Sequence, residues 1–349
     1  MATNTGMVMT VLGPIDPSRL GTTLMHEHVF IDLTHLVVNE LAAWQQPLQD
    51  AEITLASRGL LQVDPYVSRP NLSLDSEDDA VVELELFRSL GGTSVVELTT
   101  TGIKPRPSDL RAVSQRSGLH IVAGCGYYTG VTHPAEVAER SEAELIELLV
   151  DQIINGMGTD RIRPGIIGEI GTSGPIEPNE EKVLRVVAAA QNRTGLAINV
   201  HVAIFGRQAW RALDVLDAAG ADLSRVVISH LDQLPELDYH RGVLRRGATV
   251  EYDCFGSEFY FDHAGTAEPS DRERTDNLIR LLDEGWVNQL LISHDVCTKL
   301  QLVRFGGVGY GHILRSVIPR LKRRSVDGAT IRSLLVENPA RLLTIAGAV

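Results

Sequence analysis

Short apolar runs alternate with segments of helical periodicity along most of the chain. Eight of these runs have the length and continuous apolar character that are typical of strands buried on both faces of a parallel sheet. We predict strands at 22–30, 93–99, 120–124, 165–171, 197–201, 226–230, 248–253 and 290–295. A short apolar run at 8–12, followed by a Gly-Pro turn, precedes the first of them.

The segments between the strands predict helices at 75–90, 108–115, 179–191, 206–218, 234–246, 311–323 and 328–337. In the first of these, Val82, Leu86 and Leu90 are four residues apart, as on one face of a helix. Ser141 and Ser270 each stand three residues before a glutamate, a capping box that begins two further helices. The stretch 31–72 breaks the alternation, because it is rich in proline and predicts one helix only, near 39–58.

Eight strand–helix units in one chain favour a (β/α)8 TIM barrel of the α/β class. We expect a single domain over residues 1–349, because no linker, change of composition or repeat divides the chain. An open doubly wound sheet is the alternative, but it would not bring the ends of so many strands to one point. In a barrel, those carboxyl ends form a common site.

Composition narrows the class of partner. A formal net charge of −13 argues against nucleic acid or an anionic membrane surface. No run approaches the ~18 apolar residues of a membrane span, and the first residues do not resemble a secretory signal. Cys125, Cys254 and Cys297 have no disulfide or metal spacing, so we expect free thiols in a reducing compartment. These features predict a soluble, cytoplasmic protein.

One carboxylate interrupts an apolar strand. Glu169 lies among glycines and isoleucines in the run 165–171. An unpaired carboxylate in such a place either costs several kcal/mol or becomes protonated. The fold must therefore bring a neutralising group to Glu169.

Residues able to neutralise Glu169 stand at the ends of other predicted strands. His26 and His28 share one face of their strand, because side chains alternate with a period of two. The other candidates, each at the end of an apolar run, are His201, His230 and Asp295. Any one of these histidines could be a core or rim residue. Their common setting indicates a site for two divalent metal ions bridged by Glu169.

Such a site supports hydrolysis. Two ions about 3.5–4 Å apart can hold a hydroxide, lower its pKa and polarise a scissile carbonyl or phosphoryl group. Imidazole and carboxylate ligands suit Zn²⁺, with Mn²⁺, Fe²⁺ or Co²⁺ as substitutes. We predict Asp295 as the catalytic residue, because a carboxylate there can take the proton of the attacking hydroxide.

Several motifs resemble those of a known family. They are TVLGP (10–14), LMHEH (24–28), TTTGI (99–103), GEIG (168–171), SHLD (229–232) and ENP (337–339). On these motifs the chain is similar to the phosphotriesterase family of the amidohydrolase superfamily. It looks closest to the phosphotriesterase-related branch, with which EYDCFGSE (251–258) and GVGYGHIL (307–314) are shared.

The resemblance implies a barrel with a binuclear centre. The implied ligands are His26, His28 and Asp295 for the buried ion and His201 and His230 for the more exposed one. Organophosphate hydrolases of the family usually bridge their metals with a carbamylated lysine, whereas this chain has Glu169, so vigorous phosphotriesterase activity is not expected. The branch is associated with small N-acyl amides such as N-acetyltaurine. A homodimer is also implied, with 31–72 as a candidate interface.

Loops after the predicted strands supply candidate substrate-binding residues. Tyr128 could donate a hydrogen bond to a substrate oxygen or pack against its own loop. Phe255 could line an apolar pocket or belong to the core of a long loop. Lys299 and Arg304, near a glycine-rich stretch, could bind an anionic group of the substrate or lie in solvent as surface charges.

We therefore predict a metal-dependent hydrolase that cleaves a small amide, ester or lactone, with a preference for an N-acyl compound that has an anionic end. One alternative is a lactonase with weak phosphotriesterase activity. Another is a metal-binding scaffold without catalysis, although the complete set of ligands argues against it.

Overall fold

Eight parallel strands form the centre of the structure, a computed structural model that describes residues 4–204 and 206–347. The ends of the predicted 1–349 domain lie outside the described residues. The strands are β3 (Thr23–Glu27), β6 (Ser94–Glu97), β7 (His120–Cys125), β8 (Ile166–Gly171), β9 (Ile198–His201), β10 (Val226–Ile228), β11 (Thr249–Tyr252) and β14 (Leu290–Ile292). Each pairs in parallel with the next in chain order.

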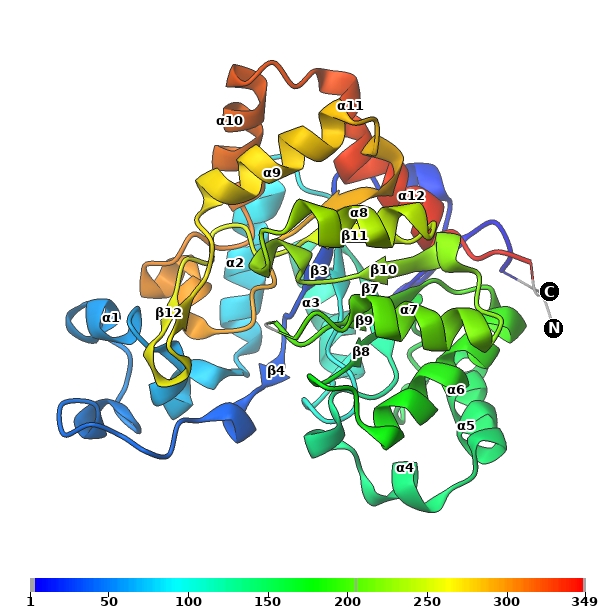
Figure 1. The fold of residues 1–349 in the computed structure, drawn as a ribbon, viewed down its shortest axis with the longest axis horizontal. Coiled ribbons are helices and arrows are strands. Elements are labelled where there is room, and N and C mark those ends of the chain that lie inside the picture. The colour runs from blue at the N-terminus through cyan, green and yellow to red at the C-terminus, as the bar shows by residue number, and fades with distance from the viewer. Residues whose placement is uncertain (1–3, 205, 348–349) are drawn as a thin grey trace.

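Helices follow the strands and lie around the sheet (Figure 1). They are α2 (Glu77–Ser89), α3 (Pro107–Ser117), α4 (Ala135–Glu139), α5 (Glu142–Asn155), α6 (Pro178–Thr194), α7 (Ala209–Ala218), α8 (Leu237–Arg245), α9 (Asp271–Asp283), α10 (Ile318–Arg323), α11 (Gly328–Arg332) and α12 (Asn338–Leu343). The predicted capping boxes at Ser141 and Ser270 begin α5 and α9. The predicted (β/α)8 barrel is confirmed. Within the described residues, no helix combines the length and the apolar composition that crossing a membrane requires.

The barrel closes between its first and last strands, where the carboxylate of Glu27 joins β3 to the segment after β14. Glu27 Oε1 accepts hydrogen bonds from the backbone N–H of His294 (3.0 Å) and from its ring Nδ1 (2.7 Å). Glu27 Oε2 accepts from the backbone N–H of Val296 at 3.0 Å. Between these two residues, the N–H of Asp295 donates to the carbonyl of His26 at 3.1 Å. This seam fixes the positions of Asp295 and His26 relative to each other.

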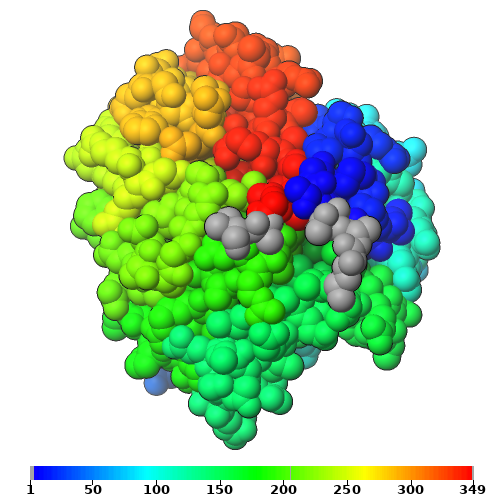
Figure 2. Space-filling view, turned by 90° about the vertical axis from the view of Figure 1, so that its right-hand side faces the viewer, coloured from blue at the N-terminus to red at the C-terminus, as the bar shows by residue number. Residues whose placement is uncertain are grey.

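A hairpin of β1 (Val8–Thr10) and β2 (Gly13–Ile15) covers the amino-terminal end of the barrel. Its buried apolar residues pack against apolar residues of the barrel strands, including Met25. The backbone of Met7 bonds to that of Ile345, so the first and last described segments lie side by side on one face (Figure 2).

The excursion 31–72 is irregular, as expected, but its predicted helix at 39–58 is wrong. Only α1 (Leu55–Leu61) is an α-helix in this stretch. Pro47 lies in a short 3-10 turn, where its ring and missing N–H do not allow a helix to continue through it. Thr54 then starts a new helix by accepting a hydrogen bond from the N–H of Ser57.

Helix α2 lies where it was predicted, but the face chosen from its periodicity is the wrong one. Val82 is 57% exposed, and Leu86 and Leu90 are exposed as well. The buried face instead contains Leu84 and Phe87. The helix carries two apolar stripes, and spacing along the chain does not distinguish the stripe that meets the barrel.

We expect Glu27→Gln to lower the free energy of unfolding by roughly 2–4 kcal/mol, because an amide group cannot accept every N–H that the carboxylate accepts. Denaturant unfolding at neutral pH measures this loss. The exposed Glu85 of α2 provides the matched control, since Glu85→Gln should change stability by no more than about 0.5 kcal/mol. Equal effects of the two variants would contradict a structural role for Glu27.

His240 of α8 predicts a pH dependence of stability. Its ring accepts from the Tyr252 hydroxyl and donates to the Leu234 carbonyl, both at 2.8 Å. Burial lowers the pKa of His240 to about 4, so the unfolded chain binds the extra proton first. Stability should therefore fall as the pH drops from about 6.5 to 4, by up to about 3 kcal/mol from this residue. Unfolding of the metal-free protein should show a shallower pH slope in His240→Gln, and parallel slopes would refute the prediction.

Candidate metal centre

The six predicted ligands come together at the carboxyl-terminal end of the barrel. They are His26 of β3 and His28 just after it, Glu169 of β8, His201 of β9, and His230 and Asp295, which lie shortly after the ends of β10 and β14. The backbone of His230 and of Asp295 is left-handed, with φ of 60° and 49°. Residues other than glycine adopt this conformation at a cost, and the positions that keep it are often functional.

Glu169 lies at the centre of the cluster and is 2% exposed. Its Oε1 is 3.3 Å from His28 Nε2, and its Oε2 is 3.1 Å from His201 Nδ1 and 3.5 Å from His230 Nε2. Burial tends to raise the pKa of Glu169, but the hydrogen bonds from these histidines outweigh it and hold the pKa well below its usual range. The carboxylate is ionised, and its Oε2 also lies 3.6 Å from Nε2 of His26, so both oxygens face imidazoles.

Two groups of ligand atoms share Glu169, one with His26 and His28 and the other with His201 and His230. Ligands of a tetrahedral zinc ion lie about 3.4 Å apart for bonds of about 2.0–2.1 Å. The separations around Glu169 agree with that value. Two further observations are compatible with nitrogens that a metal ion would bind. His26 Nε2 is buried without a hydrogen-bond partner, and His201 Nδ1 lies 2.8 Å from His230 Nε2. The residues present therefore fit divalent metal ions.

Asp295 lies next to the first group. Its Oδ1 is 3.3 Å from His28 Nε2 and 3.7 Å from His26 Nε2. The side chain is 20% exposed, unlike those of His26 and His28 in that group. Asp295 therefore faces both the metal-ligand cluster and the pocket above it.

Asp253, which was not predicted as a site residue from the sequence, contacts two of the imidazoles at their Nδ1 atoms. Its oxygens are 3.0 Å from Nδ1 of His26 and 3.2 Å from Nδ1 of His230. Burial tends to raise the pKa of Asp253, but these two histidines keep it well below its usual range. An ionised Asp253 draws the ring protons to Nδ1 and leaves both Nε2 atoms for a metal. Its signal in the sequence was a carboxylate that follows an apolar strand, the same signal as Asp295.

His28 has a separate support. Its Nδ1 is 2.8 Å from the Thr99 hydroxyl, which donates in turn to Glu97 Oε1 at 2.6 Å. With the hydroxyl proton directed at Glu97, the Thr99 oxygen accepts from Nδ1–H of His28. The Nε2 atom of His28 is then free to face Glu169 and Asp295.

A small pocket, with a cavity volume of about 30 Å³, lies beside Asp295. Tyr66 of the excursion and Phe261 of the hairpin β12–β13 (Tyr260–Phe261, Thr266–Ala267) line it, with their rings 5.2 Å apart. The Tyr128 hydroxyl is 3.5 Å from His201 Nδ1, so this predicted residue lies at the cluster. Burial raises the pKa of Tyr128, which keeps its hydroxyl protonated and able to donate.

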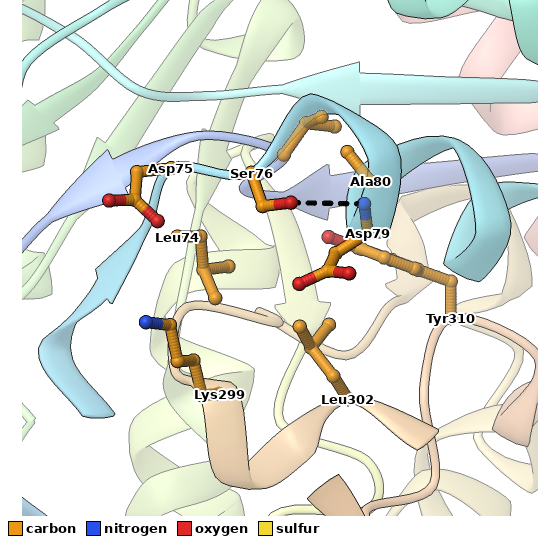
Figure 3. A pocket seen from close by; sticks show the side chains of 9 residues that line it. Leu74, Asp75, Ser76, Asp79, Ala80, Lys299, Leu302 and Tyr310 are labelled. Carbon is orange, nitrogen blue, oxygen red and sulfur yellow. Dashed lines mark hydrogen bonds between the residues drawn. The ribbon is translucent and has the colours of Figure 1, made fainter. Parts of the chain in front are cut away.

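The other predicted substrate contacts lie elsewhere. Phe255 is buried in the core and is not among the residues that line the pocket beside Asp295. Lys299 lies in a separate hollow with Asp75 and Asp79 at the start of α2 (Figure 3). Arg304 forms an ion pair with Asp79. The acidic first turn of α2 attracts both cations, so this geometry does not support an anion-binding role for them beside the metal ligands.

The fold and the cluster agree with the comparison to known families. The model of the phosphotriesterase family matches residues 6–343 of the chain. The chain belongs to the phosphotriesterase family. The resemblance seen in the motifs is therefore confirmed.

Individual relatives cover almost the whole chain. An N-acetyltaurine hydrolase of Danio rerio is 38% identical over 346 residues, which are 97% of this chain and 98% of that protein. A resiniferatoxin-binding protein from Rhodobacter sphaeroides has a TM-score of 0.95 and 37% identity, covering 98% of this chain and 96% of its own. The phosphotriesterase homology protein of Escherichia coli, complexed with phosphate in its active site, has a TM-score of 0.79 and 30% identity over 94% of this chain and 100% of its own. With these relatives, the chain is a hydrolase of the phosphotriesterase family.

Asp253→Asn should weaken Zn²⁺ binding by about 10- to 100-fold, because an amide cannot accept two ring N–H groups as the carboxylate does. Competition with a chromogenic chelator measures the affinity, and elemental analysis measures the metal content. Asp217→Asn, at an exposed position of α7, is the matched control and should bind Zn²⁺ like the parent protein. Unchanged affinity in Asp253→Asn would show that Asp253 does not orient the histidines.

Proposed function

We propose that this chain is a binuclear, metal-dependent amide hydrolase that cleaves a small N-acyl compound with an anionic end. The observation that carries the proposal is the pair of ligand groups that share Glu169, next to a pocket that Asp295 lines. Similarity to N-acetyltaurine hydrolases over nearly the full length supports the choice of an N-acyl amide. Zn²⁺ is our proposed metal, because the ligands are imidazoles and carboxylates.

Each ligand has a role in this proposal. His26, His28 and Asp295 would hold one ion, His201 and His230 the other, and Glu169 would bridge them. Two divalent ions there would lower the pKa of an attacking water and polarise the substrate carbonyl.

Three pocket residues, Asp295, Tyr66 and Phe261, and Tyr128 at the cluster would act on the substrate directly. Asp295 would accept the proton of the attacking water and deliver it to the nitrogen that leaves. The protonated hydroxyl of Tyr128 would donate to the substrate carbonyl oxygen as negative charge develops on it. Tyr66 and Phe261 would exclude water around the acyl group.

The anionic end of the substrate would point toward solvent. Among the described residues that line the pocket, none is lysine or arginine. An anion held deep in the pocket would lack a counter-charge and would pay a desolvation cost. We therefore place the acyl group inside and the acidic group at the mouth, which differs from the expected role of Lys299 and Arg304.

The broader setting is also proposed. Three free thiols suit a reducing cytoplasm, and we keep a single-domain homodimer as the expected assembly. Size-exclusion chromatography with light scattering determines the assembly.

The test of the function is a panel of substrates on the Zn²⁺-loaded enzyme: N-acetyltaurine, N-acetyl amino acids, γ- and δ-lactones, an aryl ester and a phosphotriester. We expect saturable turnover that favours the N-acyl acids. Glu169→Gln should reduce kcat/KM by at least about 1,000-fold, because the centre loses its bridging charge. Faster hydrolysis of lactones would identify a lactonase instead. Two bound metals without turnover of any substrate would show that the proposed substrate class is wrong.

A further inference from the structure

Gln233 has an acceptor without a partner beside the proposed reaction site. It ends a short 3-10 turn (Leu231–Gln233) that directly follows the predicted ligand His230. Gln233 is 4% exposed and lines the same pocket as Asp295. Its Oε1 has no hydrogen-bond partner among the described residues, although buried polar atoms are normally paired.

The orientation of the Gln233 amide follows from its neighbour Glu268. Gln233 Nε2 donates to Glu268 Oε1 at 3.0 Å. Glu268 is held in turn, because its Oε2 accepts from the Ser257 hydroxyl at 2.6 Å and from the N–H of Phe259 at 2.9 Å. Rotating the Gln233 amide by half a turn would place two acceptor oxygens against each other. Glu268 therefore keeps the NH₂ group on its own side and leaves Oε1 as the unpaired atom.

A hydrogen-bond acceptor without a partner favours substrates that supply a donor. The scissile group of a secondary amide carries an N–H, whereas the corresponding atom of an ester, a lactone or a phosphotriester is an oxygen without a hydrogen. A substrate that leaves a buried acceptor unpaired binds less well than one that satisfies it. The unpaired Oε1 of Gln233 thus favours amides over esters, lactones and phosphotriesters of comparable shape.

We propose that Gln233 Oε1 accepts a hydrogen bond from the N–H of the scissile amide and makes the enzyme selective for amides over esters. This inference rests on the proposed function. Gln233 is a specificity-determining residue in contact with the substrate, and Glu268 is a positioning residue that acts through it.

The same hydrogen bond assists the departure of the amine. When the C–N bond breaks, the nitrogen takes its proton from Asp295 and its lone pair from the broken bond. The N–H that faces Gln233 is retained throughout, so Gln233 neither gives nor takes a proton. Its contribution is to hold the nitrogen with its lone pair turned toward Asp295.

The test uses a matched pair of substrates, N-acetyltaurine and O-acetylisethionate, which differ only in an N–H or an oxygen at the scissile position. Gln233→Met keeps the size of the side chain but removes the acceptor. We expect kcat/KM for the amide to fall about 10- to 100-fold and that for the ester to change less than about 3-fold. Gln115→Met, at an exposed position of α3, is the control and should leave both values unchanged.

A second variant avoids any change at Gln233. Glu268→Gln offers an NH₂ group that lets the Gln233 amide turn, so the ratio of amide to ester turnover should fall again. Metal content and thermal melting of each variant establish that the centre and the fold are intact. In the unmodified enzyme, N-acetyl-N-methyltaurine, which lacks the N–H, should be hydrolysed more slowly than N-acetyltaurine, and Gln233→Met should narrow that difference.

The outcomes separate this inference from the proposed function. Equal losses for amide and ester in Gln233→Met would show that Oε1 is satisfied by a structural water and would overturn the inference alone. An unmodified enzyme that hydrolyses O-acetylisethionate or lactones but not N-acetyltaurine would overturn the proposed function and this inference with it. A selective loss for the amide supports both.

Discussion

The structure depends on how the charge of one buried carboxylate is neutralised. Glu169 lies in an apolar strand, where an isolated negative charge would be strongly unfavourable. Imidazoles from three other strand ends face its oxygens. These groups are far apart in the chain, and only a closed barrel brings them to one point. Closure of the barrel is therefore also what brings the neutralising imidazoles to Glu169.

The residues that close the barrel also position the predicted metal ligands. Glu27 separates two histidines that face the cluster, while its own side chain points to the other side of the strand and bonds to the segment that contains Asp295. The alternation of a strand allows one short run to serve both purposes. On the far side of the cluster, Asp253 binds one ring of β3 and one ring that follows β10. The predicted metal ligands are consequently held by a second set of buried charges.

The two ends of the barrel have different tasks. At the amino-terminal end, the β1–β2 hairpin and the last helix cover an apolar core, which contributes stability. At the carboxyl-terminal end, the excursion and the β12–β13 hairpin meet in an apolar cluster of Leu61, Phe259, Phe261 and Leu300, of which Phe259 and Phe261 line the pocket. Glu268 and Gln233 are polar residues of the same pocket that do not belong to the predicted metal ligands. The candidate substrate contacts therefore lie on loops, whereas the predicted metal ligands lie at the ends of strands.

The sequence by itself determined the barrel and the set of residues that meet at Glu169, because parallel strands are continuous apolar runs whose carboxyl ends share one edge. What it could not determine was the direction of side chains that belong to loops and helices. The exposed stripe of α2 and the position of Arg304 against Asp79 depend on packing between elements that are distant in the chain. The roles of Asp253 and Gln233 depend on partners from other strands and loops, so only the tertiary structure decided them.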